Sequence, residues 1–279
     1  MRIVRSIKQV RSAVDQARGR GLKIALVPTM GYLHEGHLSL VRIARRQADF
    51  AAVSIFVNPA QFGPREDLAR YPRNLRRDRD LLIRAGCDLL FYPSVRAIYP
   101  EGYRTYVEVE ELGKVLCGRS RPGHFRGVAT VVLKLLNIVK PDLAVFGRKD
   151  FQQAVVIRRM VRDLNVDVRI VTGSTVREKS GLAMSSRNKY LTPVERRNAA
   201  VIYRALRRVR TGFRKGESRD PKTLTRTIRD MVAEKGGRID YVAITDPERL
   251  TPVNKAKRGD LVALAAFFGK TRLIDNITL

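Results

Sequence analysis

Residues 23–37 read KIALVPTMGYLHEGH, an apolar run followed by a glycine-containing turn and the start of a helix. The apolar run from Lys23 to Pro28 is short and ends at proline, a pattern typical of a buried strand. A helix with apolar residues along one face is expected from His37 to Ala48. In an open parallel sheet, ligands bind beyond the carboxyl ends of the strands, so the segment from Met30 to His37 is the first candidate site.

Strands and helices alternate through the first two-thirds of the chain. Further strands are expected at residues 51–57, 88–92, 142–146 and 167–171, and further helices at residues 67–85, 128–139 and 150–164. Asp150 is suited to cap the last of these helices. The alternation predicts an α/β fold with a Rossmann-like, doubly wound parallel sheet.

The pattern changes near residue 172. Residues 172–190 are rich in serine, glycine and charge and are expected to form a loop. Helices are expected to begin at Thr192 and Asp220, each followed by proline. Short strands are expected at residues 241–245, 261–268 and 271–274. We therefore expect two domains, a Rossmann-like domain of residues 1–178 and a smaller α+β C-terminal domain of residues 179–279.

Two histidines mark the turn after the first strand. A helix N-terminus offers free N–H groups and positive dipole charge to phosphate, and Gly31 and Gly36 let the backbone approach a ligand closely. His34 and His37 are three residues apart, so they face the same side of the first helical turn and could donate to phosphate oxygens. Two other interpretations stay open. The histidines could cap the helix, or they could bind a metal, although HEGH lacks the zinc-protease spacing and no third ligand is evident.

A second candidate segment, GLAMSSRN, spans residues 181–188. Two hydroxyls and an arginine beside glycine are able to surround a triphosphate, and a loop at a domain junction is able to close over a substrate. Taken alone, the segment is more typical of a serine-rich surface loop.

The net charge of +28, from 55 basic and 27 acidic residues, indicates attraction to polyanions. Arginines occur in nearly every segment and aromatic residues make up only 7% of the chain, which disfavours a dedicated surface for sequence-specific nucleic acid. Cys87 and Cys117 form no C-x-x-C motif, which argues against a disulfide framework or a zinc site. The N-terminus has no apolar signal segment, and no apolar stretch is long enough to span a membrane, so a soluble cytoplasmic protein is expected.

The two candidate segments together resemble the HIGH and KMSKS signatures of the nucleotidyltransferase superfamily, whose members form adenylates by in-line attack on the α-phosphate of ATP. Five ordered motifs are similar to those of the pantothenate synthetase family. They are PTMGYLHEGH (residues 28–37), FVNPAQF (56–62), RPGHFRGV (121–128), FGRKDFQQ (146–153) and MSSRN (184–188). The resemblance implies an AMP-forming ligase that joins pantoate and β-alanine through a pantoyl adenylate, with ATP as substrate and Mg²⁺ on its phosphates.

The resemblance also implies a role for each motif. His37 is the expected catalytic residue, a proton donor to the reacting phosphates, and Gln61 and Gln153 are the expected ligands of pantoate, with Gln61 also near β-alanine. The expected ATP-binding residues are Met30, Gly31, Tyr32, Leu33, His34, Glu35, Gly36, His37, Gly147, Arg148, Lys149, Asp150, Val176, Met184, Ser185, Ser186 and Arg187. No protein metal ligand is expected, and the family implies a homodimer. Arg148 and Ser180 depart from the family pattern, in which an acid or glutamine and an acid, respectively, are more usual.

Other classes of protein stay open on the sequence. An aminoacyl-tRNA synthetase fragment would need an anticodon-binding region, for which the chain after residue 188 leaves little room. A cytidylyltransferase-like enzyme would share the first motif but not those that carry Gln61 and Gln153. A basic RNA-binding protein would explain the charge but not the ordered motifs. Dinucleotide binding is disfavoured because no G-x-G-x-x-G follows the first strand.

Overall fold

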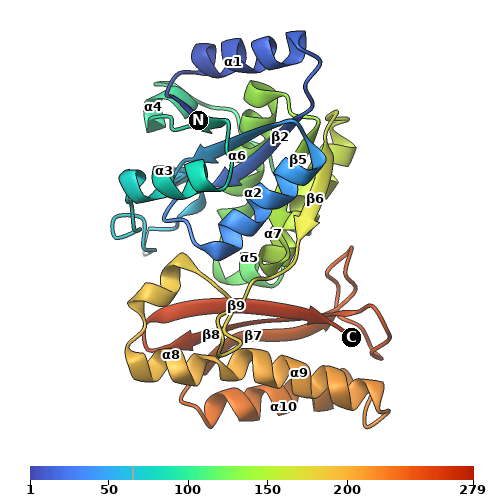
Figure 1. Ribbon diagram of the computed structural model, residues 1–279. Helices are drawn as coiled ribbons and strands as arrows, with labels where there is room; N and C mark the ends of the chain where they lie inside the picture. The colour runs from blue at the N-terminus through green and yellow to red at the C-terminus, as the bar shows by residue number, and fades with distance from the viewer. Residues whose placement is uncertain (65) are drawn as a thin grey trace.

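A computed structural model describes residues 1–64 and 66–279, and its larger domain is built on a six-stranded parallel sheet (Figure 1). The strand order is β1-β4-β3-β2-β5-β6. The strands are β1 (Arg2–Val4), β2 (Ile24–Thr29), β3 (Phe50–Ile55), β4 (Leu89–Phe91), β5 (Leu143–Gly147) and β6 (Arg169–Gly173). The order reverses between β2 and β5, which is the topological switch point of a doubly wound sheet. The predicted fold class is confirmed.

Helices bury both faces of this sheet. On one face lie α1 (Ile7–Gly19), α6 (His124–Val139) and α7 (Phe151–Asp163), and on the other lie α2 (Glu35–Gln47) and α3 (Leu75–Arg84). Side chains alternate along β2, so that Ile24 and Leu26 join the first core while Ala25 and Val27 join the second. Burial on both faces explains why the strands are apolar throughout.

Short helical turns complete the larger domain near the carboxyl ends of its strands. They are η1 (Pro59–Gln61), α4 (Val95–Ile98), α5 (Cys117–Ser120) and η2 (Arg148–Asp150). Both η1 and η2 carry residues that the sequence placed in the site, which are Gln61 in the first and Lys149 in the second.

The smaller domain is an antiparallel sheet in the order β7-β8-β9, with helices packed on one face. Its elements are η3 (Ser186–Tyr190), α8 (Pro193–Ala199), α9 (Val201–Arg214), α10 (Pro221–Ala233), β7 (Arg238–Thr245), β8 (Leu261–Phe268) and β9 (Thr271–Thr278). Thr192 and Glu195 form the predicted capping box of α8, and Asp220 caps α10. In Figure 1 the sheet lies between its helices and the larger domain, so its other face is turned toward that domain.

Two expectations about the larger domain are wrong. The helix predicted at residues 67–85 begins only at Leu75, because Pro72 disfavours a helical conformation before it and the side chain of Asn74 caps the helix by accepting from the N–H of Arg77. Asp150 stands at the N-cap position of α7, but its side chain makes no capping hydrogen bond. Two elements were not expected from the sequence: β1, which is an edge strand of the sheet, and α1, which packs on one of its faces.

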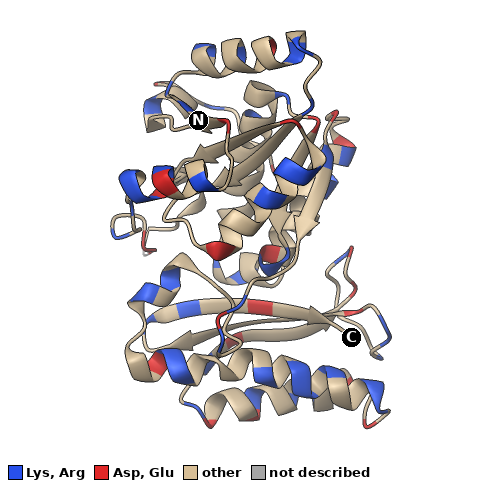
Figure 2. Cartoon of the chain, in the orientation of Figure 1, with Lys and Arg blue, Asp and Glu red and all other residues tan. Residues whose placement is uncertain are grey.

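Charge is spread over both domains. Figure 2 shows lysine and arginine on helices of each domain, without a single basic stripe. Within the described part of the chain, no helix has the length and hydropathy that crossing a membrane requires.

Candidate active site

The switch point of the sheet is open at the carboxyl ends of its strands. β2 pairs with β3 along its whole length, but it pairs with β5 only through Ala25 and Leu26. Pro28 has no N–H to donate to a neighbouring strand. Beyond that point β2 and β5 separate, and a cavity of about 190 Å³ opens between them with Pro28 and Phe146 in its wall.

This cavity brings the two predicted segments together. The predicted residues that line it are Met30, His34, Gly36, His37, Gln61, Gly147, Lys149, Asp150, Gln153, Val176, Met184, Ser185, Ser186 and Arg187. A Cβ atom on Gly36 would lie 2.8 Å from the His34 ring, so glycine leaves room for that ring, and it would be in ordinary contact, at 3.9 Å, with Cβ of Met184 from the second segment. The turn after β2 and the loop after β6 therefore enclose one space.

Five predicted residues do not line the cavity: Gly31, Tyr32, Leu33, Glu35 and Arg148. Leu33 is in the core, and Glu35 pairs with Arg42 on the surface. The side chain of Arg148 is exposed and donates to Thr278 Oγ1 at 3.1 Å. These residues shape the turns that carry the site.

His34 and His37 both cap α2, and both also line the cavity. Nδ1 of His34 accepts from the Gly36 N–H at 3.1 Å, and Nδ1 of His37 accepts from the His34 N–H at 3.3 Å. Burial, reinforced by His37 and Lys149, lowers the pKa of His34 to about 2, and burial with Lys149 lowers the pKa of His37 to about 4. Each ring is therefore neutral at pH 7. With Nδ1 accepting, the remaining proton is on Nε2, and each ring can donate one N–H.

Gln61 is held in a buried network beside the histidines. Asn58 Nδ2 donates to Gln61 Oε1 at 3.1 Å and to the carbonyl oxygen of Gly127 at 3.0 Å. Nδ1 of His124 lies 2.8 Å from the carbonyl oxygen of Gln61. A Cβ on Gly127 would lie 2.2 Å from the carbonyl oxygen of Ala60, so glycine lets α6 pack directly on η1. These contacts explain the FVNPAQF and RPGHFRGV motifs.

The loop that carries Ser185 is fastened to the larger domain. Arg187 makes a two-point ion pair with Asp67, at 3.0 Å and 2.7 Å, and Ser186 Oγ lies 3.2 Å from the Tyr71 hydroxyl. The guanidinium of Arg187 thus already has an anionic partner, while no ion pair of Lys149 is found among the described residues. Lys149 is the cation that the cavity offers to a phosphate.

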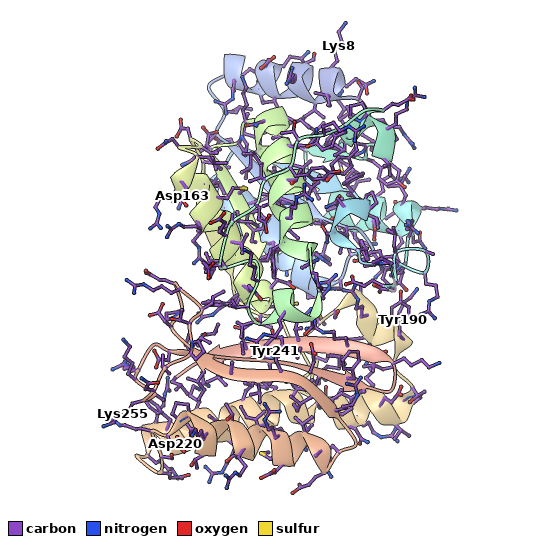
Figure 3. The ribbon with its side chains drawn as sticks, turned by 180° about the vertical axis from the view of Figure 1, so that it is seen from behind. Lys8, Asp163, Tyr190, Asp220, Tyr241 and Lys255 are labelled. Atoms are coloured by element: carbon purple, nitrogen blue, oxygen red, sulfur yellow. The ribbon has the colours of Figure 1, made fainter. Side chains whose placement is uncertain are left out.

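A larger cavity of about 1010 Å³ adjoins the first one between the two domains. The residues shared by the two cavities are Lys149, Asp150, Gln153, Ser185 and Arg187. Figure 3 shows Tyr190 and Tyr241, which line the larger cavity, where the domains meet. The smaller cavity alone is below the size usual for ligand sites, roughly 300–1,000 Å³, so the larger one provides the remaining space and an opening to solvent.

Sequence reasoning missed Asp78, a buried residue of α3 that shapes the site. Its carboxylate accepts the N–H groups of Tyr32 at 2.7 Å and Leu33 at 2.8 Å. Tyr32 has a positive φ of 50°, an unfavourable conformation for a residue with a side chain. Asp78 thus holds the turn that presents His34. Its position in an arginine-rich helix made it resemble a surface charge.

These groups suit substrate activation by a nucleotide. Neutral N–H donors, a lysine and serine hydroxyls converge on one space, and among the described residues no hydrogen bond joins a serine or cysteine to a histidine as a nucleophile would require. The class of protein that this sheet and cavity define is a doubly wound α/β protein with a polar cavity at its switch point, of the kind that binds nucleotide phosphates.

The comparisons with known proteins give the family. A family model described as pantoate-beta-alanine ligase matches residues 2–278, and the chain belongs to that family. Pantothenate synthetase of Moorella thermoacetica is 58% identical over 280 residues, with 100% of this chain and 99% of the relative covered. The chain is therefore an AMP-forming ligase that joins pantoate and β-alanine.

Solved structures agree with this assignment. Pantothenate synthetase from Thermus thermophilus superposes with a TM-score of 0.94 at 48% identity, with 99% of each chain covered. Pantoate-beta-alanine ligase from Francisella tularensis, complexed with beta-gamma ATP and beta-alanine, gives a TM-score of 0.84 at 38% identity, with 100% of this chain and 97% of that chain covered.

Proposed function

We propose that adenylate formation takes place in the smaller cavity and that the residues lining it have the roles implied by the motifs. The observation that carries this proposal is that His37 and Ser185, far apart in the chain, line the same cavity. The Francisella relative, complexed with beta-gamma ATP and beta-alanine, supports ATP and β-alanine as ligands here.

In the first step the carboxylate of pantoate attacks the α-phosphorus of ATP and pyrophosphate leaves. The Nε2–H groups of His34 and His37 donate to phosphate oxygens, and Lys149 and Ser185 supply further donors. The neutral ring of His37 donates its Nε2–H as a hydrogen bond to the charge that develops on the phosphates. In the second step the amine of β-alanine attacks the acyl carbon and expels AMP.

Pantoate fits a wall that is polar on one side and apolar on the other. Gln61 and Gln153 offer amide donors and acceptors to its hydroxyls and carboxylate. Val128, Val131 and Leu135 of α6 line the same cavity, and their apolar surface suits the two methyl groups of pantoate. A site of this kind disfavours analogues that lack a hydroxyl, because its amides would then lose their partners.

Mg²⁺ fits this site as an ion held mainly by the phosphates. The residues described, 1–64 and 66–279, contain no group of three acidic, histidine or cysteine side chains arranged to bind a metal. Asp150 lines both cavities and makes no capping bond, so its carboxylate would be the protein ligand within reach. The ion would neutralise phosphate charge as pyrophosphate leaves.

Val176 is proposed to contact adenine through its backbone, beside Met184. We place the domain boundary at residues 178 and 179, within the loop that joins β6 to η3. We also propose a homodimer in the cytoplasm, on the family resemblance alone, and sedimentation velocity would test the dimer.

Pyrophosphate release tests the proposed reaction. It should require pantoate together with ATP and Mg²⁺, and AMP should appear only when β-alanine is added. Pyrophosphate release that depends on an amino acid or RNA instead of pantoate would contradict the assignment. Lys149→Ala should raise the KM for ATP, and an unchanged KM would remove this cavity as the ATP site.

A further inference from the structure

Two consecutive residues of β9 touch the two loops that hold the proposed ATP site. Asn276 is only 6% exposed, and its Nδ2 group donates to the carbonyl oxygens of Arg148 at 3.0 Å and Lys149 at 2.8 Å. These carbonyls belong to η2, the turn that carries Lys149 into both cavities. The C-terminal strand therefore contacts the backbone of a turn in the other domain.

Asp275 reaches the other loop. Its buried carboxylate makes a two-point ion pair with Arg177, at 2.5 Å and 3.0 Å. Arg177 also donates to the carbonyl oxygen of Gly181 at 3.3 Å and lies over the ring of Tyr203, 3.6 Å from its centroid. Arg177, next to the domain boundary, is thus held by residues of the smaller domain.

The ion pair of Arg177 with Asp275 fixes both strands of the loop that leads to Ser185. Arg177 forms a bridge with Ala183, and the N–H of Met184 donates to the carbonyl oxygen of Val176 at 3.0 Å. The position of Arg177 therefore determines where Val176 and Met184 lie in the cavity.

Successive residues of a strand point to opposite faces of the sheet. Asp275 has the parity of Leu273 and Ile277, which pack in the core of the smaller domain, and Asn276 has the opposite parity. On the face of β9 that packs in the smaller domain, Asp275 holds the loop that contains Arg177. On the opposite face, Asn276 holds the turn that contains Lys149. Because β9 is a hydrogen-bonded strand, it keeps the two loops at a fixed separation.

We propose that Asp275 and Asn276 are positioning residues, which hold the Lys149 turn and the Val176–Arg187 loop at the separation that ATP requires. This inference rests on the proposed location of the ATP site. Neither residue touches the reacting atoms in this proposal, and both act through the backbone of the loops that do. Without Asn276 the Lys149 turn is free to move relative to the loop, so ATP has to order it on binding.

Asn276→Leu tests the first contact, because it keeps the branching at Cγ and removes both donors. We expect the KM for ATP to rise by about tenfold or more and kcat to fall, while the KM for pantoate stays within about twofold. Thr278→Val is the matched control. It removes the bond from the exposed side chain of Arg148 to the same strand, and its kinetic constants should equal those of the wild type.

Asn276→Ala is the second variant, in case the leucine disturbs folding. The Tm of each variant shows whether it is folded. If a folded variant has a KM for ATP within about twofold of the wild-type value, the inference is overturned. A parallel rise in the KM of both ATP and pantoate would also overturn it, because that is the result of a general structural defect. Lys149→Ala separates the two proposals, since its effect on ATP is expected even if Asn276 plays no part.

The second contact is tested by replacing both charges together, as Arg177→Met with Asp275→Leu. Removing the whole pair leaves no buried unpaired charge, so folding should be retained. We expect the same selective rise in the KM for ATP. A double variant that is folded and binds ATP as the wild type does would restrict the positioning role to Asn276 and contradict the proposal for Asp275.

Discussion

His37 combines a capping acceptor and a cavity-facing donor in one ring. Its Nδ1 accepts the His34 N–H, which leaves Nε2–H for the phosphates. A glutamine places its amide nitrogen near the position of Nε2, whereas an asparagine reaches only to the position of Nδ1. The two amides therefore separate the donor function of His37 from its capping function.

We predict that His37→Ala lowers kcat for pantoate-dependent pyrophosphate release by about 10²–10³-fold, the usual effect of losing one charge-stabilising donor. His37→Asn should be nearly as slow, and His37→Gln should recover part of the rate. Steady-state assays at saturating ATP would measure this series. Nearly full turnover in His37→Ala would show that the ring is only a cap.

Asp78 is a buried acceptor for two backbone N–H groups. Asp78→Asn keeps one acceptor but turns an amide N–H₂ group toward a backbone donor, which leaves buried polar groups unpaired. We predict a loss of about 1–3 kcal/mol in the free energy of unfolding and a higher KM for ATP. Asp80→Asn, on the same helix and with a side chain that is 44% exposed, is the control and should change stability by less than about 0.5 kcal/mol. Urea unfolding would compare the two, and equal stabilities would argue against the holding role of Asp78.

At the scale of elements, the packing of α6 on η1 depends on one missing side chain. Gly127→Ala would place Cβ 2.2 Å from the carbonyl oxygen of Ala60 and 2.7 Å from the Gln61 nitrogen. Because the obstacle is backbone, η1 has to move and Gln61 moves with it. We predict an increase in the KM for pantoate of about tenfold or more, with a smaller change for ATP. Gly123→Ala, just before α6 and with open space around it, is unsuitable as a control because its φ is 78°.

Ala129→Gly gives a better comparison, because it lies on the same helix and removes volume instead of adding it. It should lower stability by about 1 kcal/mol and leave both KM values near those of the wild type. Equal effects of the two substitutions on pantoate would mean that α6 acts only through stability.

Elements with a strong local signal were predictable from the sequence, and those defined by distant contacts were not. The apolar strands β2 to β6 and the capping box at Thr192 agree with the structure within a few residues. The helix expected from residue 67 fails because Pro72 and Asn74 outweigh its apolar periodicity. β1 has only three residues, too few for a periodic pattern, and is defined by its pairing with β4.

The site shows the same division. Contiguous motifs identified His37, Lys149 and Ser185, which the structure places in one cavity or at its rim. Asp78 and Asn276 were not predicted, because each acts on the backbone of a loop remote in sequence. Only the folded arrangement shows which carbonyls and N–H groups lie opposite such residues.

At the scale of the whole molecule, all three histidines of the chain are partly buried, and their lowered pKa values make them neutral at pH 7. Burial lowers the pKa of His124 to about 4, with Arg121 adding to the effect, and the pKa values of His37 and His34 are lowered to about 4 and about 2. In the unfolded chain each would titrate near 6.5. Between pH 6.5 and about 4 the unfolded state therefore binds more protons, so the free energy of unfolding falls as the pH falls. The stability that the neutral histidines contribute is fully present above pH 6.5.

We predict a lower free energy of unfolding at pH 5 than at pH 7.5, with each histidine contributing up to about 2 kcal/mol of the loss. Burial raises the pKa of the Asp78 and Asp275 carboxyls, and a raised carboxyl pKa opposes the trend. The decisive quantity is therefore the difference between His124→Gln and the wild type. The variant should lose less stability between the two pH values, whatever its stability at pH 7.5. Urea unfolding at both pH values would measure this. An identical pH dependence in the two proteins would mean that the pKa of His124 is the same in the folded and unfolded states, which contradicts the prediction.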